Sequence, residues 1–150
     1  YNLNVTDLQA AIGVAQMDKL PRFTEARRDN HKYYMENLKR YEEFFLLPEK
    51  SEHAKPSWFG FLLTLKEDAP FTRNEIVQHL ETSKIATRML FGGNLTKQPA
   101  YLGKKDRIIS DLNNSNYIMN NSFWIGVYPG ITKDMRSYIV HVFDDFMKKF

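Results

Sequence analysis

The chain contains no cysteine, and this absence excludes several kinds of chemistry. Its 150 residues can form no disulfide, offer no thiol nucleophile and supply no cysteine ligand to an iron–sulfur cluster. The four histidines lie far apart in the sequence and lack the spacing of metal ligands. We therefore expect no metal site in this chain.

Long hydrophobic runs are also missing. No apolar stretch approaches the roughly 20 residues of a membrane-spanning helix, and no signal peptide is present. The net charge of +3 is too small to indicate nucleic-acid binding by itself. These features predict a cytoplasmic protein without membrane contacts. Because the sequence begins at Tyr1 within a patterned segment, we expect it to be the C-terminal part of a larger protein.

The first part of the chain predicts two consecutive helices. Thr6 and Asp7 are typical of a helix N-cap, and the small residues at 10–15 favour close packing against another domain or subunit. Pro21 ends or kinks this helix and can serve as the first residue of the next one. We assign residues 1–41 to a long kinked helical segment at an interdomain or dimer interface.

Residues 42–150 predict an α/β domain. Apolar and aromatic runs of strand length occur at 44–47, 58–65, 85–91 and 123–128. Helical patterns follow Thr72 and Thr132 and occupy a short segment at 116–121, and residues 92–112 are predicted to form an irregular loop. The apolar face predicted for the helix after Thr132 consists of Met135, Tyr138, Ile139, Val142, Phe143 and Phe146. The order of these elements predicts a short mixed sheet of three to four strands packed with helices. The central strand is expected at 58–65, because it is apolar on both faces.

The stretch at 87–101 is the strongest candidate site. Gly92 and Gly93 allow positive φ and the close approach of another group. Cationic, aromatic and amide side chains surround them, namely Arg88, Phe91, Asn94, Gln98 and Tyr101. Such a set at the end of a strand is typical of a polar ligand site, although a simple turn is the alternative that composition leaves open. Six cations against one acid between residues 84 and 107 would suit a phosphate-bearing ligand.

One motif indicates a different class of function. The aromatic strand beginning at Trp58 has some likeness to the strand of an RNA-recognition domain, but Pro56 and Ser57 stand where that strand needs a basic residue and a glycine. A buried strand is the better explanation. A non-enzymatic nucleotide- or RNA-binding α/β module remains an alternative, and a salt-dependent shift of labelled RNA would favour it.

Four motifs carry a resemblance to a known family. They are Tyr-Asn-Leu-Asn-Val-Thr-Asp-Leu-Gln-Ala-Ala at 1–11 with Leu-Pro at 20–21, Pro-Ser-Trp-Phe-Gly-Phe at 56–61, Thr-Arg-Met-Leu-Phe-Gly-Gly-Asn-Leu-Thr-Lys-Gln-Pro-Ala at 87–100, and Phe-Trp-Ile-Gly-Val-Tyr-Pro-Gly at 123–130. With them the chain resembles the pyridoxal-phosphate-dependent sugar aminotransferases and dehydrases. Within that family it is most similar to the CDP-4-keto-6-deoxyglucose-3-dehydrase type of lipopolysaccharide biosynthesis. The resemblance implies the small C-terminal domain of a fold-type I enzyme.

The resemblance implies roles for individual residues. Asn2 matches the asparagine that, in the family, crosses the dimer interface to the cofactor phosphate of the neighbouring subunit. The five polar and aromatic residues of the 87–101 stretch are the implied substrate-binding residues, and Arg88 would suit a diphosphate or a keto-sugar oxygen. The catalytic residue, lysine in aminotransferases and histidine in dehydrases, is expected upstream, so this chain alone should be inactive.

The resemblance also implies cofactors and partners for the intact enzyme. Pyridoxal or pyridoxamine phosphate would serve proton removal and loss of the 3-hydroxyl from a CDP-4-keto-6-deoxyhexose. In the CDP-sugar branch, upstream cysteines hold a [2Fe–2S] cluster and a flavin/iron–sulfur reductase supplies electrons. A cytoplasmic homodimer in O-antigen deoxysugar biosynthesis is implied. A sugar-nucleotide aminotransferase is the alternative within the family, and lysine at the upstream position would favour it.

The role implied for Asn2 predicts the effect of its removal. In the intact protein, Asn2→Ala should weaken cofactor retention without unfolding, because the substitution removes one neutral donor to a phosphate oxygen. Cofactor occupancy after dialysis, measured by absorbance, tests this expectation, and a thermal melt controls for folding. Unchanged cofactor affinity would remove the assignment.

Overall fold

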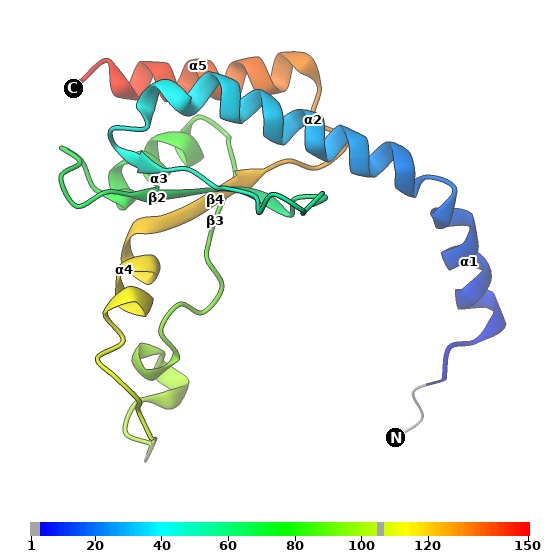
Figure 1. The fold of residues 1–150 in the computed structure, drawn as a ribbon, viewed down its shortest axis with the longest axis horizontal. Coiled ribbons are helices and arrows are strands. Elements are labelled where there is room, and N and C mark those ends of the chain that lie inside the picture. The colour runs from blue at the N-terminus through cyan, green and yellow to red at the C-terminus, as the bar shows by residue number, and fades with distance from the viewer. Residues whose placement is uncertain (1–3, 105–106) are drawn as a thin grey trace.

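A four-stranded sheet with helices on one face organises the chain (Figure 1). The computed structural model describes residues 4–104 and 107–150. In these ranges the α-helices and strands are α1 (Asp7–Met17), α2 (Leu20–Leu38), β1 (Phe45–Leu46), β2 (Gly60–Leu65), α3 (Arg73–Thr82), β3 (Thr87–Met89), α4 (Asn113–Asn121), β4 (Ser122–Gly126) and α5 (Lys133–Met147). Short 3-10 helices lie at η1 (Lys39–Tyr41), η2 (Leu95–Lys97) and η3 (Pro99–Tyr101). The last two give order to the segment that the sequence predicted as an irregular loop.

The strands lie in the order β1-β2-β4-β3, and each described pair of neighbours is antiparallel. The expectation of an α/β fold with up to four strands is confirmed, and β2 is a central strand. The expectation of a mixed sheet is wrong for the described strands. β2 and β3 run in the same direction on either side of α3, but β4 lies between them and is antiparallel to both. No parallel pair can therefore form between them.

The core lies between the sheet and helices α2, α3 and α5. Alternate strand residues enter it, because successive side chains of a strand point to opposite faces. Phe61 and Leu63 of β2 and Phe123 and Ile125 of β4 are at most 1% exposed. Helix α5 adds four of the predicted residues, Ile139, Val142, Phe143 and Phe146. Its predicted apolar face is too wide, because Met135 and Tyr138 each remain 49% exposed.

The N-terminal segment forms two helices, α1 and α2, as the sequence predicted. Thr6 caps α1 through a capping box with Gln9, and Pro21 lies in the first turn of α2. Figure 1 shows α1 extending away from the sheet. No residue of α1 is buried, and even its apolar side chains are exposed, with Leu8 at 76% and Val14 at 70%. None of the helices in the described ranges is long and apolar enough to span a membrane.

Helix α2 is anchored to the sheet by an aromatic stack. His31 is only 5% exposed, and its imidazole lies parallel to the Trp58 indole at a centroid distance of 3.8 Å. Burial lowers the pKa of His31 to about 4, because the charged imidazolium would lose its hydration. The imidazole is therefore neutral at neutral pH. This neutral ring packs as part of the core.

The lowered pKa of His31 predicts a pH dependence of folding. The unfolded chain takes up a proton at this histidine near pH 6.5, whereas the folded chain does so only near pH 4. The free energy of unfolding should therefore fall as the pH is lowered from 6.5 toward 4. Chemical denaturation at several pH values measures this slope. In His31→Phe, which retains a ring against Trp58, the slope should be smaller, and an unchanged slope would contradict the assignment.

Candidate functional site

The face of the sheet opposite the core is partly open. Leu62, Trp124 and Arg88 are paired in register across β2, β4 and β3, so their side chains lie on one face in a row. Helix α4 lies against one end of this face, where Thr64 and Ser122 share a buried hydrogen bond of 2.8 Å. The remainder of the face is available to another part of the protein or to a ligand.

Three aromatic side chains form the centre of this open face, and we call Phe59, Phe91 and Trp124 the aromatic patch. The Trp124 ring lies 5.0 Å from that of Phe59 and 5.1 Å from that of Phe91, between ring centroids. Phe59 is 73% exposed and Phe91 is 79% exposed. Exposed apolar rings clustered in this way mark a surface that is covered by a ligand or by protein.

The local sequence explains how the aromatic patch is built. Trp58 and Phe59 are consecutive in an extended segment, so Trp58 faces His31 on the helix side while Phe59 lies beside Trp124. Gly60 leaves room for the indole, because a Cβ at that position would lie 3.3 Å from the Trp124 ring. Phe59 and Trp124 were not among the predicted site residues. The alternation of side chains along each strand is the signal that could have identified them.

Arg88 is placed on the open face by an anchored strand. The neighbouring residue Thr87 is buried, and its N–H and hydroxyl both donate to Glu81 Oε1, at 2.6 and 2.7 Å. These two hydrogen bonds lower the pKa of Glu81, because they stabilise its carboxylate. The Arg88 side chain is exposed and donates one hydrogen bond to the Thr87 carbonyl. Most of its guanidinium donors thus remain available to an anion.

A second arginine borders the aromatic patch. The Arg27 guanidinium lies 5.9 Å from the centroid of the Phe59 ring. Its Nε donates to the carbonyls of Ser57 and Trp58, at 2.9 and 2.6 Å. Arg27 therefore fixes the segment before β2 and adds positive charge beside the patch.

The loop that follows β3 has a tightly determined backbone. Phe91 has a φ of 49° and Gly93 a φ of 59°, both in the left-handed region. A Cβ on Gly93 would lie 2.4 Å from Cγ of Met119, so helix α4 lies directly against this glycine. The sequence prediction that the double glycine allows positive φ and a close approach is confirmed at Gly93.

Two predicted substrate residues have hydrogen bonds within this loop. Asn94 is 5% exposed, donates to Asn116 Oδ1 at 2.8 Å, and accepts from the N–H and hydroxyl of Thr96. Gln98 Nε2 donates to the Gly92 carbonyl at 2.7 Å. In this conformation both amides hold the loop that carries Phe91.

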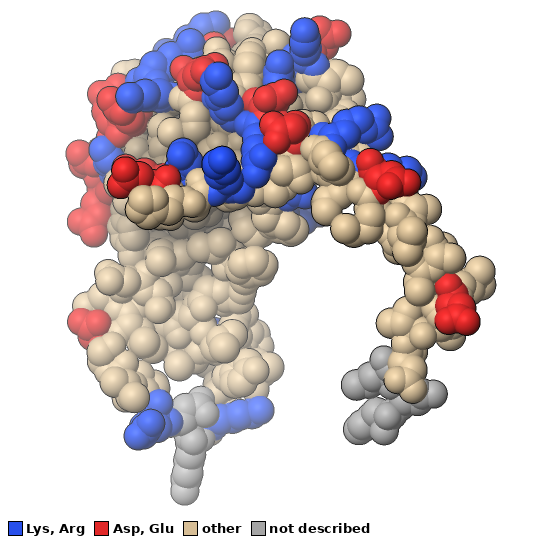
Figure 2. Space-filling view, turned by 45° about the vertical axis from the view of Figure 1, so that its right-hand side comes forward, with Lys and Arg blue, Asp and Glu red and all other residues tan. Residues whose placement is uncertain are grey.

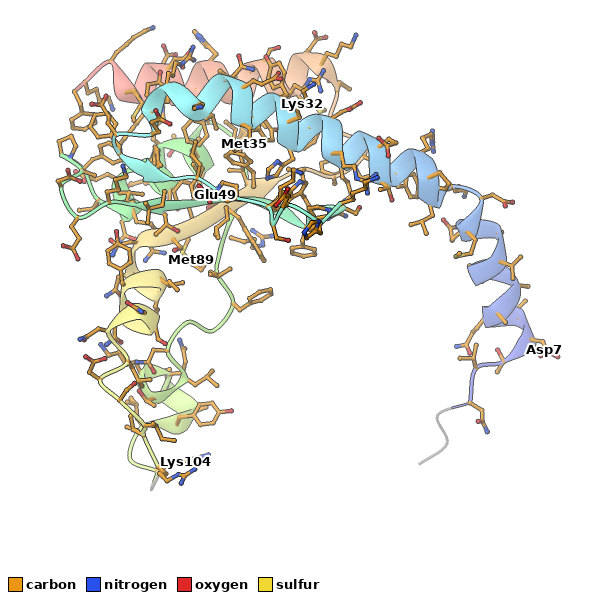
Figure 3. The ribbon with its side chains drawn as sticks, viewed as in Figure 1. Asp7, Lys32, Met35, Glu49, Met89 and Lys104 are labelled. Atoms are coloured by element: carbon orange, nitrogen blue, oxygen red, sulfur yellow. The ribbon has the colours of Figure 1, made fainter. Side chains whose placement is uncertain are left out.

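The structure brings together only part of the predicted site. Arg88 and Phe91 lie on the open face, whereas Tyr101 lies farther along the loop, beside Lys104 at its tip (Figure 3). Asn2, predicted to reach a cofactor phosphate, lies outside the described residues. Among the residues that the structure describes, no three His, Asp or Glu side chains are grouped as metal ligands.

Charge is unevenly distributed over the surface. Figure 2 shows Lys, Arg, Asp and Glu gathered over the helix-covered side of the sheet, whereas α1 shows few of them and the arm leading to α4 carries Lys and Arg mainly at its tip. α1 contributes Leu8, Ile12 and Val14 to this uncharged surface, each at least 60% exposed. Exposed apolar side chains gathered in this way are typical of interfaces.

Comparison with known proteins identifies a family. The family model for the DegT/DnrJ/EryC1/StrS aminotransferases matches residues 1–144. The lipopolysaccharide biosynthesis protein RfbH of Salmonella typhimurium is 46% identical over 146 residues, which are 97% of this chain and 33% of that protein. The dTDP-4-dehydro-2,6-dideoxy-D-glucose 3-dehydratase of Saccharopolyspora spinosa is 45% identical over 149 residues, or 99% of this chain and 32% of that enzyme. The chain thus spans about a third of the length of these relatives.

Solved structures agree with this assignment. The GDP-4-keto-6-deoxy-D-mannose-3-dehydratase of Escherichia coli, determined with bound hydrated PLP, superimposes with a TM-score of 0.77 at 26% identity. The match covers 95% of this chain and 36% of that one. The described helices and antiparallel sheet therefore have the architecture of the C-terminal region of a fold-type I aminotransferase.

The position of Gly93 predicts a graded loss of stability on substitution. Gly93→Ala introduces both a strained φ and an overlap with Met119, and should destabilise the fold by about 2 kcal/mol or more. Gly103→Ala is the matched control, because Gly103 has a φ of 76° but an added Cβ would meet no atom within 4 Å. It should cost only the backbone strain, about 1 kcal/mol. Urea denaturation measures both.

A double substitution separates the two effects. Met119→Ala in the Gly93→Ala background should recover the part of the lost free energy of unfolding that is due to the overlap. The effects of the two substitutions on stability should therefore be non-additive in a double-mutant cycle. Additive effects of the two substitutions would show that α4 does not restrict the loop at this point.

Proposed function

Since this chain belongs to the DegT/DnrJ/EryC1/StrS aminotransferase family, we propose that it is the C-terminal part of a pyridoxal-phosphate-dependent sugar-nucleotide 3-dehydrase. The observation that carries the proposal is its similarity, over nearly its whole length, to a protein named as a sugar-nucleotide 3-dehydratase. The E. coli structural neighbour is also named as a 3-dehydratase. A sugar aminotransferase of the same family is the competing function, and lysine rather than histidine at the upstream catalytic position would establish it.

The substrate in this proposal is a CDP-linked 4-keto-6-deoxyhexose. The named 3-dehydratases act on dTDP- and GDP-linked sugars, so the relatives support the keto-sugar chemistry more strongly than the choice of nucleotide. The similarity to RfbH supports a role in lipopolysaccharide biosynthesis. A cytoplasmic location, a [2Fe–2S] cluster on upstream cysteines and an external flavin/iron–sulfur reductase complete the proposal.

The residues of the open face fit a phosphorylated ligand that contains rings. Arg88 offers free guanidinium donors of the geometry that binds phosphate oxygens in pairs. The aromatic patch beside it offers flat apolar surface to a sugar or cofactor ring. Pyridoxal phosphate, when bound, supplies an electron sink to the substrate.

In this proposal the chain binds and encloses the substrate. Arg88 binds the diphosphate or the keto-sugar oxygen, and Phe91 covers the sugar and excludes water from it. Asn94 and Gln98 hold the loop that presents Phe91, and Gln98 Oε1 can accept from the substrate while Nε2 keeps its hydrogen bond to Gly92. Tyr101 extends the substrate-facing edge along the loop. The proton-transfer group lies on the larger domain, outside this chain.

Residues 1–41 serve the assembly in the same proposal. The side chains of α1 are largely apolar yet none is buried, and burying one such Leu or Val side chain would contribute roughly 1.5–3 kcal/mol. We propose that α1 packs at an interface with the larger domain and a second subunit of a homodimer. Asn2 precedes this helix in the sequence and would thereby reach the neighbouring subunit's cofactor phosphate.

The role of Arg88 predicts a separation of substrate and cofactor effects. In the intact protein, Arg88→Ala should raise KM for the sugar nucleotide at least tenfold, because a charge-assisted contact of about 1.5–3 kcal/mol is lost. Steady-state kinetics measure KM, and absorbance of the bound cofactor should stay unchanged.

Lys133→Ala is the matched control. Lys133 is an exposed cation at the start of α5, on the helix-covered side of the sheet, and its removal should leave KM unchanged. Loss of the cofactor spectrum in Arg88→Ala would instead place this arginine at the cofactor, and an unchanged KM would remove it from the site.

A further inference from the structure

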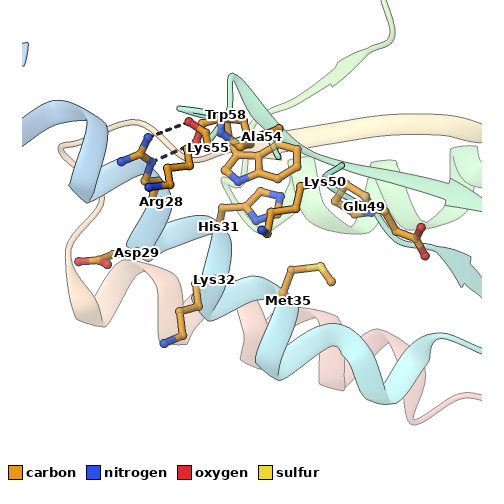
Figure 4. Close-up of a pocket in the computed structure, with 12 residues that line it drawn as sticks. Arg28, Asp29, His31, Lys32, Met35, Glu49, Lys50, Ala54, Lys55 and Trp58 are labelled. Atoms are coloured by element: carbon orange, nitrogen blue, oxygen red, sulfur yellow. Dashed lines mark hydrogen bonds between the residues drawn. The ribbon is translucent and has the colours of Figure 1, made fainter. Parts of the chain in front are cut away.

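A cavity lies on the opposite side of the sheet from the aromatic patch. It has a volume of about 660 Å³ and lies between α2 and the segment at 48–58 (Figure 4). We call it the α2 cavity. Its lining shares no residue with the 87–101 stretch. Figure 3 shows Lys32 and Met35 on α2 with Glu49 nearby, far from Lys104 at the tip of the loop.

The walls of the α2 cavity are held in place by Arg28. Its guanidinium donates to the carbonyl oxygens of Lys55 at 2.7 Å and Pro56 at 3.2 Å, and forms an ion pair with Glu25 at 2.7 Å. Figure 4 shows the first two hydrogen bonds closing one end of the cavity. Arg28 therefore binds the loop to the helix, so its charge is already compensated and it does not serve as a ligand-binding group.

The inner wall of the cavity is aromatic and apolar. His31 is only 5% exposed and stacks on Trp58, and its Nε2 is covered by the protein, so this nitrogen does not face a ligand. Trp58, Met35, Pro48 and Pro56 line the cavity with apolar surface suited to a ring.

The rim of the cavity is positively charged overall. Apart from Arg28, which is paired with Glu25, the lining has three cationic side chains and two anionic ones, Asp29 and Glu49, which gives a net charge of +1. Within the described residues, Lys50 and Lys55 make no ion pair, and Lys32 has only an exposed contact of 3.7 Å with Glu36. Two lysines on one loop are thus available to an anion that enters the cavity.

From this arrangement we propose that the α2 cavity binds a small anion that carries a flat ring, with Lys50 and Lys55 on the anionic group and the Trp58 wall against the ring. The volume is within the range of small-molecule sites. A nucleoside monophosphate and an aromatic carboxylate are two sources of this chemistry. The site is separate from the proposed substrate site and does not depend on it.

Calorimetric titration of the intact protein tests the proposal with three probes. Adenosine 5′-monophosphate and benzoate both combine a ring with an anion and lack the cytidine of the proposed substrate, and ribose 5-phosphate lacks the flat ring. We expect one of the first two to bind with a dissociation constant below about 1 mM, a generous limit for a small ligand, and ribose 5-phosphate to bind at least tenfold more weakly. Which of the two binds identifies the anionic group. Equal binding of ribose 5-phosphate would overturn the role of the ring.

Matched variants locate the binding. The double substitution Lys50→Gln and Lys55→Gln should weaken binding at least tenfold. Lys133→Gln with Lys149→Gln removes the same charge from the start of α5 and from just beyond its end, outside the cavity, and should change binding less than twofold. Arg88→Ala should leave it unchanged, which distinguishes this cavity from the substrate site. Absence of binding by both ring-bearing probes, or binding that survives the loss of Lys50 and Lys55, would overturn the proposal.

Discussion

The position of β4 between β2 and β3 is the constraint on which the remaining structure depends. β4 pairs antiparallel with both strands, which fixes their register and keeps them from pairing in parallel with each other. Because side chains alternate along a strand, this register sends Phe123 and Ile125 into the core and Trp124 to the open face. One short strand thereby provides packing on one side and the centre of the candidate site on the other.

The two faces of the sheet have different chemistry for the same reason. Trp58 and Phe59 are neighbours in the chain, yet one stacks on His31 beneath α2 and the other joins the aromatic patch. Any movement of this segment would alter both the α2 cavity and the open face. Arg27 and Arg28 restrain it from adjacent positions of α2, each by hydrogen bonds to backbone carbonyls of residues 55–58.

The loop after β3 shows how polar residues can support a site without contacting a ligand. Asn94 and Gln98 have the side chains of ligand-binding residues, but the Asn94 amide donates to Asn116 of α4 and the Gln98 amide donates to the Gly92 carbonyl of the loop. Such internal hydrogen bonds reduce the conformational freedom that binding would otherwise remove. A rigid loop at Gly93, packed on Met119, can present Phe91 at a fixed position beside Trp124.

The sequence by itself determined the elements and the family. Hydrophobic periodicity located the four strands, and side-chain capping residues located the starts of α1, α3 and α5, because these signals arise between residues close in the chain. The motifs at 1–11, 56–61, 87–100 and 123–130 were sufficient to indicate the family that the comparisons confirm. Arg88 and Phe91 were found as site candidates because they flank a glycine pair next to a strand.

Only the tertiary structure decided which of these elements are neighbours. Antiparallel pairing of β4 with both β2 and β3 depends on contacts between distant segments, so the sequence pattern suggested a mixed sheet and did not reveal Phe59 and Trp124 as a pair. The α2 cavity could not be predicted from the sequence for the same reason, since His31 and Trp58 lie far apart in the sequence and come together only by stacking in the folded protein. Local patterns determine secondary structure, whereas a site is formed by side chains that only the packed fold brings together.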